Sequence, residues 1–523
     1  ANGAFRPGQS LCITAGLAGA ENTPYANEVT HRLRYGASRL SQTVRFGQGR
    51  VFALPLGWPE AENTPYANEA EPRTQVPGGL GFASRRVGKQ DLSVNQRMGL
   101  RRIRPEWCYY KPFWQDLEKA GHKAVVLDVP YSFPRALKQG VEITDWATHG
   151  QTLPTSSNQS DVLRTLQRFG PSPIGRETPI QKTAKELSKI QDQLVKSAVL
   201  KGQLILQLME SQDWDLFIAV FGETHRGGHI FFSDEDEGAD NRDTPLTQIY
   251  QAVDQALARI LDSVDADTAV VIFSVHGMAR DYNQVHMVRP LVKRANEVFL
   301  EKFCNIAPKG VSKANGLVPY LRKAVPAWVQ YPVAAAMPDF VRQWVVEQEI
   351  IGGLDWSITP GFALRTDIRT ELRLNLVGRE AQGFLQPQSK LHYEYVDFIK
   401  GVFLGLQDKD TGANLIDEVV DTQFLFPGCN SRSLPDLVMT WKPSPPAKLA
   451  YSPLVGEVMA QAPSVRGGDH TDYGFVVLPP DLKPKGDLTH ITDLAGFSQG
   501  FFEKTNDRGC EAFKSHCHLS GEG

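Results

Sequence analysis

The chain has 523 residues, of which 41% are hydrophobic and 22% are charged, and its formal net charge is −3. This length and composition are typical of a globular protein with one large α/β domain that carries insertions, or with two domains. The near-neutral charge gives no indication of a nucleic-acid-binding surface or a polybasic membrane patch. Six cysteines without a CxxC pair argue against a disulfide framework and against a structural zinc knuckle.

The sequence also lacks the main membrane signal. It contains no run of about twenty apolar residues, so we expect no transmembrane helix. We therefore predict a soluble protein, with a cytoplasmic location favoured over export after processing.

The first 104 residues are read as a divergent first part of an α/β core. Leu11–Ala20 is strand-like and ends in small residues, and Asn27–Leu40 has the pattern of a helix. The nine residues AENTPYANE occur twice, at Ala20–Glu28 and again at Ala61–Glu69. A single pair of copies is no solenoid, so it indicates a local duplication or an error in the sequence.

From Pro105 onward, helical and strand-like patterns alternate. Such alternation predicts a largely parallel sheet that is covered by helices on both faces. The expected helices are Phe113–Gly121, Thr178–Gln212 and Thr247–Val264, and the expected strands are Lys123–Val129, Asp215–Phe221 and Ala269–Phe273.

An inserted cap is predicted at 299–365, where tryptophans and prolines interrupt this alternation. Ile368–Leu376 and Asp436–Trp441 are again strand-like and are read as a return to the core. The predicted organisation is therefore 1–104, the first part of the core; 105–298, the core with the functional loops; 299–365, the cap; 366–495, the remainder of the core; and 496–523, a flexible tail.

Histidines occur at three places, two of them after expected strands and one at the end of a loop. His225 and His229 lie four residues apart with two glycines between them, and we expect these glycines to let the backbone close around a ligand. His276 follows the strand at Ala269–Phe273, and His470 ends the motif GGDH. Since carboxyl ends of parallel strands meet at one sheet edge, a shared metal site is favoured over three unrelated surface histidines.

Several motifs between Pro105 and Ala495 resemble one known family in their order along the chain. They are DVPYSFP (Asp128–Pro134), DWATHG (Asp145–Gly150), DWDLFIAVFGETHRGGH (Asp213–His229), VVIFSVHGM (Val270–Met278), NQVH (Asn283–His286), RLNLVGREAQG (Arg373–Gly383) and VRGGDHTDYG (Val465–Gly474). The chain is similar to the alkaline phosphatase superfamily, in particular to its type I phosphodiesterase/nucleotide pyrophosphatase branch. The resemblance implies a three-layer α/β/α sandwich and hydrolysis of a small phosphorylated substrate.

The resemblance also implies two metal ions, usually zinc or manganese, with a Ser or Thr nucleophile between them. One ion is carried over to His225, His229 and His470. The second ion in the family takes two Asp residues, the nucleophile and a histidine that corresponds to His276.

The sequence departs from the family at this second ion. Val275 stands where the family has the Asp of an Asp-His pair, and Ala18 stands where it has the Asp of the first strand. The family's nucleophile follows a Trp-Pro pair, whereas Trp58-Pro59 is followed by Glu60, and the candidates Thr64 and Thr23 lie at other offsets. We therefore expect one site for zinc or another divalent transition metal and a degraded second site.

The remaining candidates each have an ordinary alternative. His286 and Arg379 are candidates for substrate binding, against a histidine at a helix start and a surface arginine, and Arg466 is judged in the same way. Asp469, Asp472 and Glu223 are candidates to orient an imidazole, against solvated loop acids.

Three functional hypotheses follow from these observations. The first is a metal-dependent hydrolase of phosphate esters with a reduced metal centre. The second is a catalytically impaired pseudoenzyme of the same fold that acts as a binding or scaffold protein. The third is an ordinary two-metal enzyme whose amino-terminal sequence is imperfect, although Val275 lies within the matching region.

Overall fold

The computed structural model describes most of the chain after residue 111. The described ranges are 112–130, 137–148, 154–170, 182–233, 244–265, 268–307, 354–364, 370–425, 434–459, 466–471 and 474–478, with a few single positions besides. Of the first 111 residues it describes only the backbone of four strands, β1 (Ser10–Ala15), β2 (Gln42–Arg45), β3 (Gly81–Phe82) and β4 (Leu100–Arg101). The expected helix at Asn27–Leu40, both copies of the repeat and the tail from 503 lie outside the described residues.

The main sheet, within the described part of the chain, has eight strands in the order β2-β19-β9-β1-β8-β5-β6-β7. Its members besides β1 and β2 are β5 (Ala124–Leu127), β6 (Val141–Thr144), β7 (Ser156–Ser157), β8 (Leu216–Phe221), β9 (Ala269–Ser274) and β19 (Phe475–Leu478). The pairs among β9, β1, β8, β5 and β6 are parallel, whereas β19, β2 and β7 pair in the antiparallel sense. The predicted α/β class with a largely parallel sheet is confirmed.

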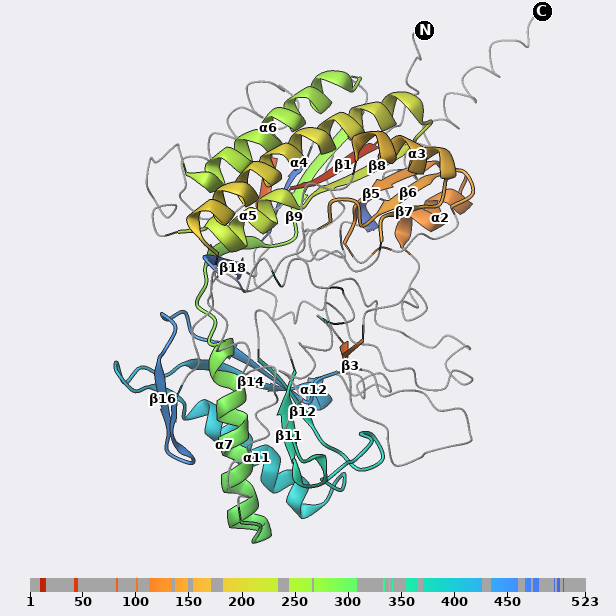
Figure 1. Cartoon of the computed structure of the whole chain (residues 1–523). Helices are drawn as coiled ribbons and strands as arrows, with labels where there is room; N and C mark the ends of the chain where they lie inside the picture. Colours follow the sequence, from red (N-terminus) through yellow and green to blue (C-terminus); the bar gives the residue numbers. More distant parts are fainter. Residues whose placement is uncertain are drawn as a thin grey trace, which may run out of the picture.

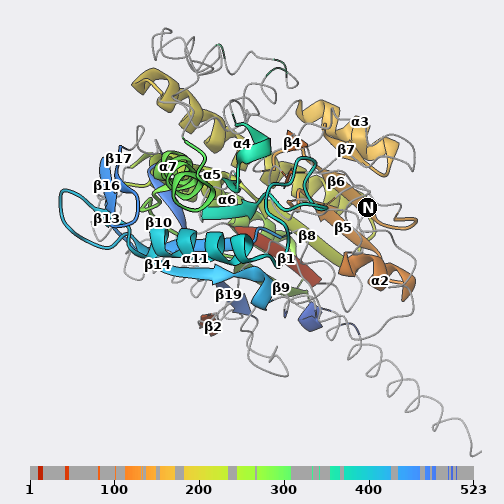
Figure 2. The same ribbon diagram turned by 90° about the horizontal axis from the view of Figure 1, so that it is seen from below.

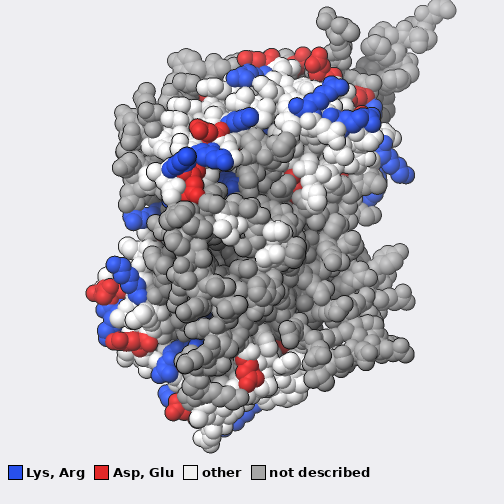
Figure 3. Space-filling model, in the orientation of Figure 1, with Lys and Arg blue, Asp and Glu red and all other residues white. Residues whose placement is uncertain are grey.

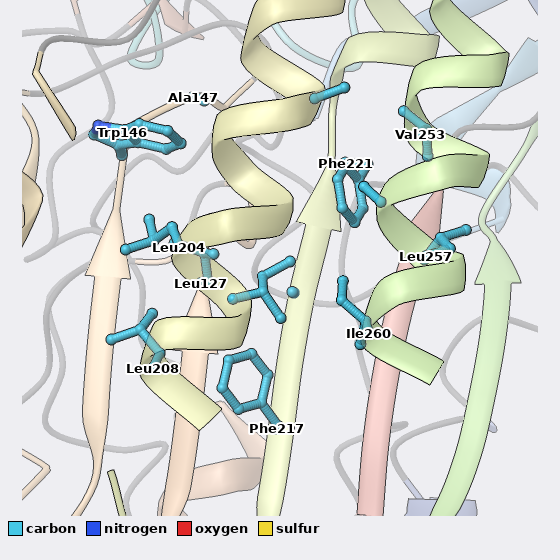
Figure 4. Packing of buried hydrophobic residues seen from close by; sticks show 14 of the residues in the cluster. Leu127, Trp146, Ala147, Leu204, Leu208, Phe217, Phe221, Val253, Leu257 and Ile260 are labelled. Carbon is cyan, nitrogen blue, oxygen red and sulfur yellow. The ribbon is translucent and has the colours of Figure 1, made fainter. Parts of the chain in front are cut away.

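Helices cover one face of this sheet, as Figure 1 shows. They are α3 (Ser160–Phe169), α4 (Ala184–Ser211), α5 (Glu223–Phe231) and α6 (Pro245–Ser263). Figure 4 shows Leu204 and Leu208 of α4 and Leu257 of α6 packed above Phe217 and Phe221 of β8. This apolar layer fixes both long helices on the sheet.

The other face of the sheet carries a second apolar layer. Val125 and Leu127 of β5 join the cluster under α4 and α6, whereas the alternating Ala124 and Val126 join a cluster with Trp114 of α2 (Phe113–Lys119). Since successive strand residues point to opposite faces, the uninterrupted apolar run of β5 buries both.

Local sequence signals explain where the long helices begin. Thr183 and Glu186 form a capping box at the start of α4, with each side chain bonded to the other's backbone N–H. Thr244 caps α6, and Pro245 occupies its first turn, where no backbone N–H is needed.

A second core lies beside the first. Helix α7 (Val285–Cys304) leaves the main sheet and packs with α11 (Lys390–Leu404) around residues such as Phe299, Tyr395 and Phe403. In Figures 1 and 2 these two helices lie beside strands that do not belong to the main sheet. One sheet has the order β11-β12-β15-β14, from β11 (Gly361–Ala363), β12 (Thr370–Leu374), β14 (Ile416–Asp421) and β15 (Leu437–Trp441). A smaller sheet contains β13 (Gln407–Asp408), β16 (Leu449–Ser452) and β17 (Gly456–Met459).

The strands expected at Ile368–Leu376 and Asp436–Trp441 are therefore present as β12 and β15, but they pair with each other and not with the main sheet. Within the predicted remainder of the core, 366–495, β19 is the described strand that returns to the main sheet. Most of the predicted cap at 299–365 lies outside the described residues. The division into segments otherwise remains a prediction.

The described surface fits the balanced composition. On the face seen in Figure 3, basic and acidic side chains lie near one another on the described residues. Among the helices that the structure describes, none is both long enough and apolar enough to cross a membrane.

Candidate metal centre

Helix α5 begins directly after β8 and carries the first two histidines. Gly222 is its N-cap, so β8 delivers the helix start to the carboxyl edge of the sheet. Residues four apart lie on one helix face. The Nε2 atoms of His225 and His229 are accordingly 3.1 Å apart.

The two glycines between these histidines serve packing. A Cβ on Gly227 would lie 2.9 Å from Cδ1 of Ile249 on α6, and a Cβ on Gly228 would lie 2.8 Å from Cε of Met278. These contacts correct the expectation that the glycines close the backbone around a ligand. They let α5 approach Ile249 of α6 and Met278 closely.

A two-stranded ribbon brings the third histidine to α5. Strands β10 (Gly277–Arg280) and β18 (Gly468–Thr471) pair antiparallel, with Met278 opposite His470. Nε2 of His470 lies 3.3 Å from Nε2 of His225. In Figure 1, β18 lies below α5, on the side of the main sheet that faces the second core.

The three rings form an even triangle. Each pair among His225, His229 and His470 has ring centroids 4.7 Å apart, and one nitrogen of each ring lies within 4.8 Å of the other two. Nitrogen ligands at about 2.0–2.1 Å from a tetrahedral zinc ion lie about 3.3 Å from one another. The Nε2–Nε2 separations of 3.1 and 3.3 Å therefore match the ligand spacing of such an ion.

One of these rings is anchored by the backbone on its other nitrogen. Nδ1 of His229 lies 2.9 Å from the carbonyl oxygen of Gly468. A carbonyl only accepts, so Nδ1 carries the proton and Nε2 keeps its lone pair for a ligand.

His276, the fourth predicted ligand, lies beside the triangle and outside it. Its Nε2 is 3.1 Å from Nδ1 of His225, and its Nδ1 is 3.0 Å from the carbonyl oxygen of Gly277. Its ring stacks on His470 with the centroids 3.9 Å apart. Burial lowers the pKa of His276, which favours its neutral form.

Neither of the two residues just before His276 is a carboxylate. Ser274 is buried at the end of β9, and its hydroxyl donates to the carbonyl oxygen of His276 over 2.5 Å. Val275 is 52% exposed and contributes an apolar side chain to the solvent-facing surface.

Asp469 is buried beneath the ribbon. Its carboxylate accepts from the backbone N–H of His470 at 2.8 Å and from Nδ2 of Asn283 at 3.2 Å. Burial and the neighbouring Asp281 raise the pKa of Asp469 to about 7, and the charge of Arg466 opposes this rise. Asp469 thus supports the backbone of a candidate ligand, whereas Asp472 lies outside the described residues.

Glu223 belongs to a buried charge cluster that the sequence did not reveal. It accepts a 2.6 Å hydrogen bond from Ser197, and Nζ of Lys201 lies 3.6 Å from it and 3.0 Å from Asp128. Lys201, Asp128 and Glu223 have no exposed surface. Burial alone would lower the pKa of Lys201, but Glu223 and Asp128 prevail and raise it, so the ammonium stays charged.

This cluster ties α4, β5 and α5 together. Asp128 also accepts from the backbone of Trp146 and Ala147 at 2.8 Å each. Glu223 therefore anchors the first turn of α5 through Lys201, and among the described residues its side-chain partners are Ser197 and Lys201 and not an imidazole. Two sequence features could have revealed this cluster. Lys201 is a lysine among apolar residues of a helix, and Asp128 is an Asp at the end of a strand.

The two predicted substrate-binding residues have protein partners elsewhere. Nε2 of His286, on α7, donates to the carbonyl oxygen of Ala447 at 2.9 Å. Arg379 makes two 2.7 Å bonds to Asp436 and one of 2.9 Å to Glu380, and its side chain is 8% exposed. These contacts give both residues structural roles in the second core. Thr64, Thr23 and Ala18 lie outside the described residues.

Comparison with solved structures finds similar chains at low identity. Phosphonoacetate hydrolase from Sinorhizobium meliloti 1021, in complex with phosphonoformate, is 11% identical with a TM-score of 0.45, and the match covers 94% of this chain and 95% of that one. A mutant of alkaline phosphatase PafA is 11% identical with a TM-score of 0.39, over 91% and 92% of the two chains. Murine ectonucleotide pyrophosphatase/phosphodiesterase 5 is 10% identical with a TM-score of 0.29, over 71% of this chain and 64% of that one.

No curated protein matches the chain. The sequence model of one family does match. It is described as type I phosphodiesterase/nucleotide pyrophosphatase and covers residues 75–335, which include β8, α5, β9 and three of the four clustered histidines. Residues 75–335 of the chain thus match the type I phosphodiesterase/nucleotide pyrophosphatase family.

Proposed function

We propose that this chain is a metal-dependent hydrolase of phosphate esters, of the phosphodiesterase or phosphatase type, with one divalent ion held by His225, His229 and His470. The observation that carries the proposal is the convergence of three Nε2 atoms at the carboxyl edge of the sheet. The match of residues 75–335 to the family model supports the reaction class.

The donor set fits zinc or another divalent transition metal. Imidazole nitrogens suit such ions, and three protein ligands leave a position open, as catalytic zinc sites do. A bound dication supplies positive charge that polarises a phosphoryl oxygen and makes water reactive near neutral pH. The substrate class that this charge favours is a small phosphorylated molecule.

The chain's own residues then hold the centre in place. His229 is oriented by the carbonyl of Gly468, and α5 is anchored by the charge cluster around Lys201. Thr64 and Thr23 remain the candidates for a nucleophile that the sequence offers. The alternative function is a pseudoenzyme that keeps the fold and the ion, and it is favoured by the exposed Val275 where the family has a carboxylate.

A metal and turnover assay on purified full-length protein tests the proposal. We expect about one zinc-type ion per chain by elemental analysis and hydrolysis of bis(p-nitrophenyl) phosphate that a chelator removes. His225→Ala is expected to lose both, whereas the control His392→Ala, in the second core, is expected to keep both. Retention of one ion without turnover would support the pseudoenzyme, and absence of the ion, or turnover unchanged in His225→Ala, would overturn the three-histidine centre.

A further inference from the structure

We infer that His276 is a positioning residue that orients His225, and that it does not hold a second ion. This inference rests on the proposed three-histidine centre. It differs from the role that the family resemblance implies for this histidine.

The hydrogen bonds around His276 determine which nitrogens carry protons. The carbonyl oxygen of Gly277 only accepts, so Nδ1 of His276, 3.0 Å away, is the donor. A neutral imidazole has one N–H, so Nε2 of His276 is an acceptor. Nδ1 of His225, 3.1 Å from it, must therefore be the donor in their contact.

This assignment leaves Nε2 of His225 with its lone pair. That is the atom that lies 3.1 Å from Nε2 of His229 and 3.3 Å from Nε2 of His470. The relay from Gly277 through His276 to His225 thus selects the tautomer in which His225 can bind an ion. Metal-binding histidines commonly donate their second N–H to such an acceptor.

Two contacts hold His276 in this orientation, one to its ring and one to its backbone. It stacks on His470 with the centroids 3.9 Å apart and the planes inclined by 29°. The hydroxyl of Ser274 bonds to its carbonyl oxygen, which fixes the backbone at the end of β9.

The same contacts leave no lone pair of His276 for a second ion. Its Nε2 accepts the hydrogen bond from Nδ1–H of His225, and its Nδ1 donates to the carbonyl oxygen of Gly277. The adjoining Val275 adds no carboxylate, and the group of described residues that converges on one point is limited to His225, His229 and His470. The group that accepts from His225 is the neutral ring of His276 and not a carboxylate. It adds no negative charge beside the bound ion, so the full positive charge of the ion acts on the substrate.

Two variants of His276 separate positioning from ligation. His276→Phe keeps a ring against His470 but removes the acceptor, and His276→Gln places a side-chain oxygen near the former Nε2. We expect one zinc ion per chain in all three proteins, with zinc affinity 10–100-fold lower in His276→Phe and largely recovered in His276→Gln. Zinc affinity is measured by competition with a chromophoric chelator, and Val275→Ala is the control with native affinity.

A second measurement on the metal-free native chain needs no variant. Long-range ¹H–¹⁵N spectra of ¹⁵N-histidine-labelled protein are expected to show His225 protonated at Nδ1. Two ions in the native chain and one in His276→Phe, unchanged affinity in His276→Phe, or His225 protonated at Nε2 would each overturn the inference. A native chain that binds no zinc would instead overturn the proposed centre, while the spectra still decide the pairing of His276 with His225.

Discussion

His229 donates from Nδ1 to the carbonyl oxygen of Gly468 over 2.9 Å, so helix α5 is bonded to the strand that carries His470. This contact requires the two backbones to lie close together. A Cβ on Gly468 would be 2.6 Å from the carbonyl oxygen of Gly228 and 2.8 Å from Cβ of Phe232.

Gly468→Ala is therefore expected to separate α5 from β18 and to weaken the metal centre. Neither obstructing group is the mobile end of a side chain, so we expect a loss of about 1–3 kcal/mol in the free energy of unfolding and a clear loss of zinc affinity. Gly401→Ala, on α11 in the second core, is the control, because its Cβ would meet only Cδ1 of Leu454. Equal zinc affinities of the two variants, by chelator competition, would contradict the proposed role of this contact.

Lys201→Met tests the buried charge cluster. The substitution leaves Asp128 and Glu223 buried without their cation, for which we expect a cost of about 3–5 kcal/mol. The free energy of unfolding is measured in urea. Adding Glu223→Gln to Lys201→Met should restore part of the loss, and a double variant no more stable than Lys201→Met would show that the pairing of Lys201 with Glu223 contributes little.

The stability of the second core is expected to depend on pH through His286. Burial lowers the pKa of His286 in the folded chain, whereas the unfolded chain has the ordinary value of about 6.5. As the pH falls below about 6.5, the unfolded state takes up a proton that the native state does not, so stability decreases. Urea unfolding at pH 5.5 and pH 7.5 measures this change.

His286→Gln keeps a donor for the carbonyl of Ala447 but cannot titrate in this range. The variant should lose less stability between pH 7.5 and 5.5 than the native chain does. An identical pH dependence in both proteins would assign the effect to other groups.

Arg379→Met distinguishes a structural from a substrate-binding arginine. Asp436 and Glu380 would lose a partner bonded at 2.7 to 2.9 Å in a buried setting, so we expect a loss of about 3–5 kcal/mol in unfolding free energy. KM for a phosphodiester should change by less than about twofold in folded protein, because the guanidinium is occupied by protein acceptors. A large rise in KM at native stability would restore the substrate-binding role.

Zinc itself is expected to stabilise the folded chain. A ligand that binds only the native state at 100 times its Kd adds about 2.7 kcal/mol, so Tm should rise with zinc concentration. His470→Ala should abolish the rise, and His392→Ala should keep it. A zinc-dependent Tm in His470→Ala equal to that of the native chain would place the ion elsewhere.

The sequence predicted best what is encoded in short segments. The spacing of His225 and His229 and the apolar runs of β8 and β9 are local signals, and the structure brings both histidines together at a strand end. His470 could be added because it ends a recognisable motif of its own, GGDH.

The parts that could not be predicted depend on partners distant in sequence. No feature of the sequence near Arg379 indicates that this arginine pairs with Asp436, 57 residues away. Its positive charge alone suggested that it binds a phosphate group. The strands β12 and β15 look like core strands, and only their mutual pairing reveals a separate sheet. The role inferred for His276 depends on a carbonyl acceptor and on ring orientation, which a motif does not specify.

The separation of 245 residues between His225 and His470 has a consequence for how the protein matures. A chain still emerging from the ribosome presents His225 and His229 long before His470 exists, and two imidazoles bind an ion far more weakly than three. The whole second core lies between them and must be accommodated before β18 can pair with β10. At the proposed centre, an ion would therefore bind only to chains whose synthesis and folding are nearly complete, and it would hold together two segments that the chain makes far apart in time.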